Sequence, residues 1–249
     1  MTNSYSSSKK ALRLVFIHGL NNNPECFLPI MDHFRALGYE TELVVLPGHG
    51  EVREETSSHK TAFSHFTSRM KLISTAPYAV IAFSQGALYL QLWLEKNPDN
   101  KPVSQVLLAP ALYLRRQKFL DKVLLKLPAW LTIKSFSPKP FRRYHTMKIW
   151  EYRTLFDGVK TYQKTKGKFR IPTKVFIDPM DELVDSQTLE ECLAASNLGH
   201  GVELVRRPTL KRGPGQHHII FHPDYFRPEE WERFTGLVLD FLLRFEATR

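Results

Sequence analysis

The stretch YAVIAFSQGALYLQLWLEK, residues 78–96, places Ser84 between an apolar run and a helical pattern. The run at 78–83 has the length and composition of a strand that is buried on both faces. A helix is predicted to begin directly after the serine. Ala82 and Gly86 are small enough to permit a sharp turn, which would lift the Ser84 side chain out of the sheet edge. A serine that merely caps a helix gives the same local pattern, so this stretch alone leaves its role open.

Apolar runs and helical patterns alternate along the rest of the chain. Strands that are separated by helices have to pair in parallel, and a parallel sheet needs helices on both of its faces. The sequence therefore predicts an α/β fold with a doubly wound, mostly parallel six-stranded sheet. Its expected strands are residues 12–17, 41–46, 78–83, 103–108, 174–177 and 202–205, and its expected helices are 24–37, 61–74, 85–96, 186–196 and 228–245.

Residues that can carry chemistry follow several of these predicted strands. In an open parallel sheet, the loops at the carboxyl ends of the strands form the ligand crevice. A serine, an aspartate and a histidine follow separate strands in that order. The residues concerned are His18-Gly19, Gly48-His49-Gly50, Ser84, the loop at 178–181, and His217 with His218.

One segment, residues 111–170, carries most of the positive charge. It holds 16 Lys or Arg against three acidic residues, a net charge of +13, whereas the rest of the chain has a net charge of −3. It also contains 11 of the 30 aromatic residues. We expect this segment to be a basic, aromatic-rich helical cap inserted into a core made of residues 11–110 and 171–249. Residues 1–10 are expected to form a flexible tail.

The composition excludes several classes of protein. With 43% hydrophobic and 24% charged residues, the chain is typical of globular proteins and not of disordered ones. Two cysteines, Cys26 and Cys192, argue against a disulfide framework and against a cysteine-based zinc site. No apolar run reaches the roughly 18 residues of a membrane-spanning helix. Residues 1–10 lack the pattern of a secretory signal, so a cytoplasmic protein is expected.

In strand order, motif order and position of the insert, the chain resembles the α/β-hydrolase superfamily, most closely carboxylesterases and monoacylglycerol-lipase-like enzymes. The resemblance rests on the His-Gly pair, the Gly-His-Gly loop, the insert at 111–170 and the serine turn, where Ala82 replaces the first glycine of G-x-S-x-G. It implies that Ser84 is the nucleophile. It also implies that the backbone N–H groups of Leu20 and Gln85 form the oxyanion hole, and that His49 is a structural residue that hydrogen-bonds the oxyanion loop.

The resemblance further implies a base and an acid. A serine hydroxyl attacks only when a neutral histidine accepts its proton, and a carboxylate orients that histidine. Asp181 matches the position of the family's acid, whereas Asp178 and Asp185 are expected to be a loop-forming acid and a helix cap. Of the two adjacent histidines, His218 directly precedes two apolar residues, as the catalytic histidine does in similar esterases. His217 stays open as the alternative base.

These features predict a serine hydrolase that cleaves carboxylic esters of an apolar or amphiphilic acyl group, with no cofactor and no metal. The i, i+4 spacing of His218 and His222 lacks the glutamate of an H-E-x-x-H metal motif. Peptidase, lactonase or thioesterase activity on the same fold is an alternative. A different class, a non-catalytic binding module that contacts an anionic membrane through the cap, is also open. The absence of a recognised motif argues against nucleic-acid binding.

The start of the insert has the pattern of a basic amphipathic helix at 112–127. Arg115, Lys118, Lys122 and Lys126 recur at three- and four-residue spacing and share one face. The simpler interpretation is a cap helix with a solvated basic side. The sharper one is a lid over Ser84 that meets anionic lipid or a negatively charged amphiphilic substrate.

Overall fold

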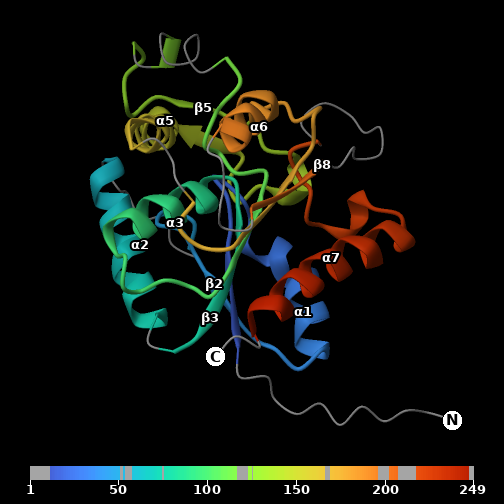
Figure 1. The fold of residues 1–249 in the computed structure, drawn as a ribbon. Coiled ribbons are helices and arrows are strands. Elements are labelled where there is room, and N and C mark those ends of the chain that lie inside the picture. Colours follow the sequence, from blue (N-terminus) through green and yellow to red (C-terminus); the bar gives the residue numbers. More distant parts are fainter. Residues whose placement is uncertain are drawn as a thin grey trace, which may run out of the picture.

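The computed structural model describes residues 12–50, 53, 58–74, 76–116, 123–124, 126–165, 169–195, 202–206 and 217–246. Its centre is a six-stranded sheet in the order β2-β1-β3-β4-β7-β8, in which every neighbouring pair is parallel (Figure 1). The strands are β1 Arg13–Ile17, β2 Glu40–Val44, β3 Tyr78–Phe83, β4 Gln105–Leu108, β7 Thr173–Ile177 and β8 Val202–Arg206. The expected doubly wound α/β fold is confirmed.

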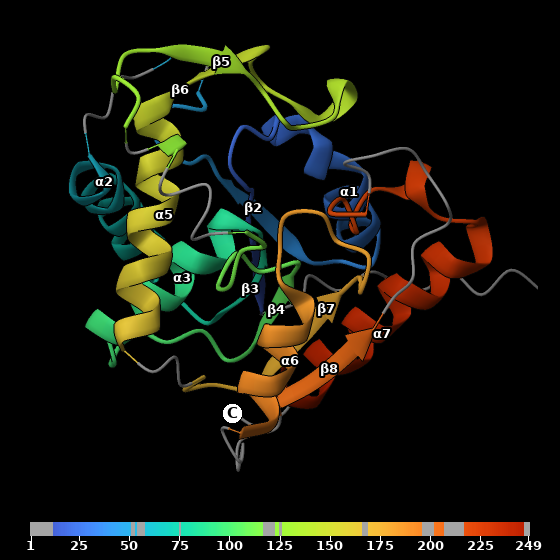
Figure 2. The same cartoon turned by 90° about the horizontal axis from the view of Figure 1, so that it is seen from above.

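Helices cover both faces of the sheet, as Figure 2 shows from above. Apolar side chains of α1 and α7 pack on one face and those of α2, α3 and α6 pack on the other. The helices are α1 Leu28–Ala36, α2 His59–Ile73, α3 Gln85–Lys96, α6 Ser186–Ala195 and α7 Pro228–Glu246, with short 3-10 turns at Pro24–Phe27, Lys139–Phe141 and Pro223–Tyr225.

Alternation along β1 divides the core between the two faces. Val15 and Ile17 belong to the cluster on the α3 side, whereas Leu14 and Phe16 belong to the cluster on the α1 side. Every residue of the inner strands β3, β4 and β7 is buried. The edge strands β2 and β8 are mostly half-exposed. This difference explains why most residues of these inner strands are apolar.

Most element ends agree with the sequence patterns to within two residues. The strand at Tyr78–Phe83 is as predicted. Helix α1 ends close to Gly38, whose φ of 90° is incompatible with a right-handed helix and would strain a residue with a side chain. The strand that follows Pro102 begins at Gln105, two residues later than predicted. Regular local periodicity was therefore sufficient to locate the core elements.

The insert differs from the expected helical cap. It contains one long helix, α5 Ile149–Lys164, which packs against α2 and α3, and also an antiparallel pair, β5 Thr132–Lys134 with β6 Thr146–Lys148. Strands of three residues are too short to produce a recognisable alternation. At the start of α5 the Glu151 carboxylate accepts the Lys148 N–H and pairs with Arg53. A small apolar cluster joins α5 to the antiparallel pair.

The predicted amphipathic helix is wrong at its beginning. Residues 112–116 form turns, and Leu114 makes an isolated antiparallel bridge with Val184. Arg116 has a φ of 53°, which ends any right-handed helix at that point. Residues 117–122, including two of the four basic positions, lie outside the described residues, as does the predicted tail at 1–10. Contact of this segment with an anionic membrane stays a prediction.

Within the described ranges, the structure contains no helix that is both long and apolar enough to cross a lipid bilayer.

Candidate active site

The candidate site lies where the strand order reverses. After β1 the chain forms β2 on one side of β1, and it then returns to form β3 on the other side of β1. The connections that follow β1 and β3 therefore run in opposite directions along the sheet. Such a switch point leaves an open crevice at the carboxyl ends of the two strands. Ile17 pairs with Ala82 at these ends, which brings the loop after β1 beside Ser84.

Ser84 occupies a strained turn between β3 and α3. Its φ of 51° and ψ of −117° are rare for a residue with a side chain. A Cβ added at Gly86 would lie 2.4 Å from the carbonyl oxygen of His18, and one added at Gly19 would lie 2.9 Å from the Ser84 Cβ. Only glycine fits at either position, so close approach of the β1 loop to the α3 start holds the serine in place.

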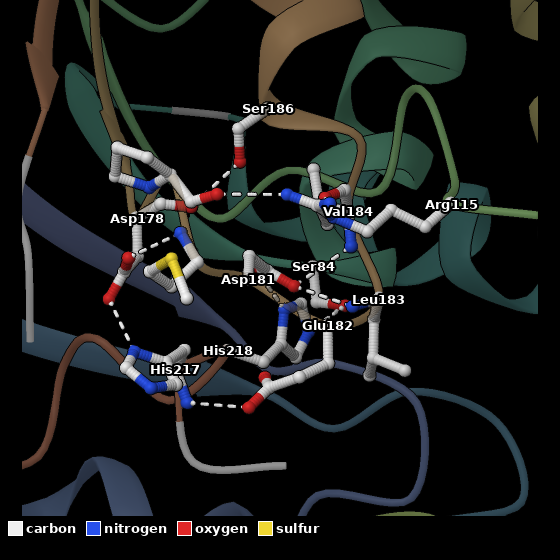
Figure 3. A network of polar contacts seen from close by, with 12 residues as sticks. Ser84, Arg115, Asp178, Asp181, Glu182, Leu183, Val184, Ser186, His217 and His218 are labelled. Carbon is white, nitrogen blue, oxygen red and sulfur yellow. Dashed lines mark hydrogen bonds and ion pairs between the residues drawn. The ribbon is translucent and has the colours of Figure 1, made fainter. Parts of the chain in front are cut away.

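One chain of hydrogen bonds joins the three residues that the resemblance assigned (Figure 3). His218 Nε2 lies 2.9 Å from Ser84 Oγ, and His218 Nδ1 lies 2.7 Å from Asp181 Oδ2. A carboxylate only accepts hydrogen bonds, so Nδ1 carries the proton and Nε2 accepts from the serine hydroxyl. Phe83 packs against the His218 ring at a centroid distance of 4.8 Å. All three side chains are buried.

The loop after β7 presents Asp181 through its own backbone. Asp181 Oδ1 accepts the N–H groups of Leu183 and Val184, each at 2.8 Å, which leaves Oδ2 for His218. Two backbone donors fix the plane of the carboxylate. Asp185 instead caps α6, accepting the Thr188 N–H at 3.1 Å.

Arg115, at the start of the insert, holds this loop from outside. Its backbone N–H donates to Leu183 O at 2.9 Å, its Nε to Val184 O at 3.2 Å and its Nη2 to Pro179 O at 2.8 Å. These contacts join residues more than sixty positions apart in the chain. No periodicity or motif signals them, and sequence reasoning assigned Arg115 only to a basic helix face.

His217 makes a second Asp-His pair beside the first. Its Nδ1 lies 3.1 Å from Asp178 Oδ2, and its backbone N–H donates to Glu182 Oε1 at 3.5 Å. Asp178 Oδ1 also accepts the Met180 N–H at 2.7 Å, the loop-forming role expected of it. The ring of His217 therefore faces Asp178, while that of His218 faces Ser84.

Two backbone N–H groups remain for an oxyanion. In the part of the chain that the structure describes, neither Leu20 N–H nor Gln85 N–H has a hydrogen-bond partner. Gln85 begins α3, where N–H groups have no acceptor within the helix. The next amide in the β1 loop, Asn21 N–H, donates to His49 Nε2 at 2.6 Å. The N–H groups of Leu20 and Gln85 are thus available to a bound ligand, and His49 bonds the loop as expected.

Asn21 ties the β1 loop to the insert. Its side-chain Nδ2 donates to Ser135 Oγ at 2.7 Å and to Tyr144 O at 2.8 Å, and its Oδ1 accepts Tyr144 N–H at 2.9 Å. Its backbone has a φ of 51°, which asparagine tolerates better than most residues. Residues 135–145 of the insert are thereby joined to the loop that carries Leu20. No motif or spacing in the sequence signals this contact.

His18 and His49 shape the same loop as neutral rings. His18 Nε2 accepts Leu46 N–H at 2.9 Å and its Nδ1 donates to Gly19 O at 2.8 Å. Burial, with the nearby His49 ring, lowers the pKa of His18 to about 3. Burial also lowers the pKa of His49 to about 4, with a smaller lowering from Arg53. Both rings stay uncharged at neutral pH.

These two histidines predict that the fold loses stability in weak acid. A histidine in the unfolded chain has a pKa near 6.5, so below that pH the unfolded state binds protons that the folded state excludes. The contribution of each histidine to the free energy of unfolding is therefore at its maximum above about pH 7. The free energy of unfolding should fall by about 1 to 3 kcal/mol per histidine on acidification to about pH 4.5. Urea unfolding at a series of pH values measures this loss.

A matched pair of variants isolates the effect. His49→Gln keeps a hydrogen-bond acceptor but cannot titrate, so it should flatten the pH dependence of the free energy of unfolding. His65→Gln, at an exposed position of α2, should leave the dependence unchanged. Equal slopes for the wild type and His49→Gln would contradict this account.

A cavity of about 360 Å³ opens onto Ser84 and His218. Most of its wall is apolar, with Leu20, Leu114, Leu124, Leu155 and Phe156 among the lining residues. Its size and character suit a small ligand with a hydrophobic part. Among the described residues, no group of three or more His, Cys, Asp or Glu side chains is placed to hold a metal ion.

A sequence profile described as the alpha/beta hydrolase family matches residues 14–242. No curated protein matches the sequence significantly. One similar solved structure is a monoacylglycerol lipase from Paleococcus ferrophilus, with a TM-score of 0.70 and 17% identity over 95% of this chain and 97% of that chain. A second is a highly thermostable carboxyl esterase from Bacillus coagulans in complex with glycerol, with a TM-score of 0.74 and 13% identity over 96% of this chain and 92% of that chain. A third is a soluble variant of monoglyceride lipase from Saccharomyces cerevisiae in complex with a substrate analog, with a TM-score of 0.72 and 12% identity over 93% of this chain and 87% of that chain. At these identities the likeness concerns the fold alone.

Proposed function

Because the chain belongs to the alpha/beta hydrolase family, we propose that it is a serine hydrolase that cleaves carboxylic esters through an acyl-enzyme. The observation that carries the proposal is the hydrogen-bonded chain from Ser84 Oγ through His218 to the Asp181 carboxylate. A lone serine at a helix start would have no reason to meet a histidine from a loop 134 residues further along the chain.

Each group has a role in ester cleavage. His218 Nε2 takes the proton of Ser84 as its oxygen attacks the ester carbonyl, and the imidazolium that forms is stabilised by Asp181. The N–H groups of Leu20 and Gln85 donate to the developing oxyanion, and each such donor contributes about 10²- to 10³-fold to the rate in comparable sites. His218 then protonates the leaving alcohol and, in the second half, activates the water that releases the acid.

The cavity supports an acyl or alcohol group with a substantial apolar part. When an apolar group of the substrate lies against the leucine and aromatic side chains of this wall, its surface is removed from water. Each Å² of apolar surface buried in this way contributes about 25 cal/mol to the binding free energy. Similar structures that are named as lipases and carboxyl esterases point in the same direction. Peptide or lactone cleavage would use the same groups, and the choice between them depends on the cavity and the leaving group.

A panel of p-nitrophenyl esters of increasing acyl length, run beside matched anilides and lactones, tests the proposal. We expect kcat/KM to rise from acetate to a medium-length acyl chain as the chain fills the apolar wall, by roughly threefold per buried CH₂ group. Anilides should be cleaved at least about 100-fold more slowly, because the amine of an anilide is a much poorer leaving group than p-nitrophenolate. Faster cleavage of anilides than of esters would favour a peptidase instead.

A further inference from the structure

The wall of the cavity beside Ser84 is mostly apolar. Three charged side chains line it, namely Arg115, Arg116 and Glu182. Both arginines belong to the segment that links β4 to the rest of the insert. Two cations and one carboxylate therefore line a wall that is otherwise made of apolar and uncharged polar residues, with His218.

Arg116 is held in a conformation that costs energy. Its φ of 53° is in the left-handed region, where a residue with a long side chain is disfavoured by about 1 kcal/mol or more. Its side chain is exposed and makes no ion pair with any residue in the described part of the chain. An unpaired guanidinium at a substrate cavity, carried on a strained backbone, suggests a binding role.

Arg115 fixes the position of this segment. Its guanidinium donates to two neutral backbone carbonyls, Val184 O and Pro179 O, and forms no ion pair with the described residues. The Leu114–Val184 bridge and the Arg115 N–H to Leu183 O bond pin the residues just before Arg116 to the loop that carries Asp181. Arg116 thus projects from an anchored point, and the charge of Arg115 adds to the attraction of an anion.

We propose that Arg116 binds an anionic group that is part of the substrate itself. The preferred ester would then combine an apolar chain, lying along the leucine and phenylalanine wall, with a carboxylate or phosphate at the arginine end of the cavity. A guanidinium binds either anion through two parallel N–H donors. This inference rests on the proposed function, because it takes Ser84 as the group that attacks the ester.

Two pairs of esters, matched in chain length, test the proposal from the two sides of the ester bond. In the first pair the acyl chain ends in a carboxylate or a methyl group: mono-p-nitrophenyl suberate against p-nitrophenyl octanoate. In the second pair the alcohol part carries the charge, and p-carboxyphenyl octanoate is compared with phenyl octanoate. Each kcat/KM of this pair is divided by the rate of uncatalysed hydrolysis of the same ester, because the two phenols differ as leaving groups. For the wild type we expect kcat/KM to favour the anionic ester by about tenfold or more in one of the pairs.

Variants assign the preference to Arg116. Arg116→Gln should lower the anionic-to-neutral ratio by about tenfold, and Arg116→Glu should lower it further, to favour the neutral ester. Arg116→Gly removes the charge and also suits the positive φ, so it provides a variant that folds without strain. Lys134→Gln, at an exposed position of β5 that does not line the cavity, should keep the wild-type ratio.

The ratio is taken within each variant, so partial loss of folded protein cancels. If none of the four esters is hydrolysed by the wild type, the proposed function fails. If neutral esters are hydrolysed but neither pair shows a preference that depends on Arg116, the function stands and this inference is overturned. An equal loss of the preference in Lys134→Gln and Arg116→Gln would also overturn the inference. That result would mean that the overall positive charge of the protein, and not Arg116 itself, attracts the anionic ester.

Discussion

Ser84→Ala should lose ester hydrolysis by on the order of 10⁴-fold or more in kcat, with a small change in KM. The substitution removes the only hydroxyl that His218 contacts in the described part of the chain, while alanine keeps the volume at the turn between β3 and α3. Binding in the apolar cavity and the N–H donors of Leu20 and Gln85 would survive, and they account for the residual rate. Steady-state kinetics on the best p-nitrophenyl ester measure the loss.

A fluorophosphonate probe gives a second readout of the same serine. The wild type should gain the mass of one probe, and Ser84→Ala should gain none. Ser68→Ala, on the exposed side of α2, should be labelled and should hydrolyse esters like the wild type. Equal labelling of the wild type and Ser84→Ala would mean that a different residue is the nucleophile.

The second large effect is expected at His218. His218→Ala should approach the loss of Ser84→Ala, because no other ring nitrogen lies at hydrogen-bond distance from Ser84 Oγ in the described residues. Asp181→Asn should lose on the order of 10³- to 10⁴-fold, since it removes the charge that stabilises the imidazolium and favours the wrong tautomer.

His217→Ala is the matched control. It replaces the neighbouring histidine and breaks the pair with Asp178, but it leaves the bonds of His218 intact. We expect it to keep activity within about tenfold of the wild type. A larger loss for His217→Ala than for His218→Ala would reverse the assignment of the base.

The resemblance carried by the sequence motifs led to the right family and fold, and the order of serine, aspartate and histidine is visible in the sequence alone. The residues alone did not decide between the two adjacent histidines, because both lie just before the same apolar pair, and only the resemblance favoured His218. In the structure His217 pairs with Asp178 and His218 with Asp181, so the two rings diverge. The insert was the weakest prediction: a basic helix was expected where Leu114 instead bridges to Val184.

Local sequence by itself determined the strands, the helices around them and the sharp turn at Ser84. Apolar periodicity and the small residues Ala82 and Gly86 act over a few positions, so their effects can be read from neighbouring residues. Tertiary structure decided which side chains meet. Asn21 contacts Tyr144 across 123 positions, and His218 contacts Ser84 across 134. Such contacts depend on how the sheet order brings loops together and on the path of each loop backbone, and neither is encoded in the spacing of residues along the chain.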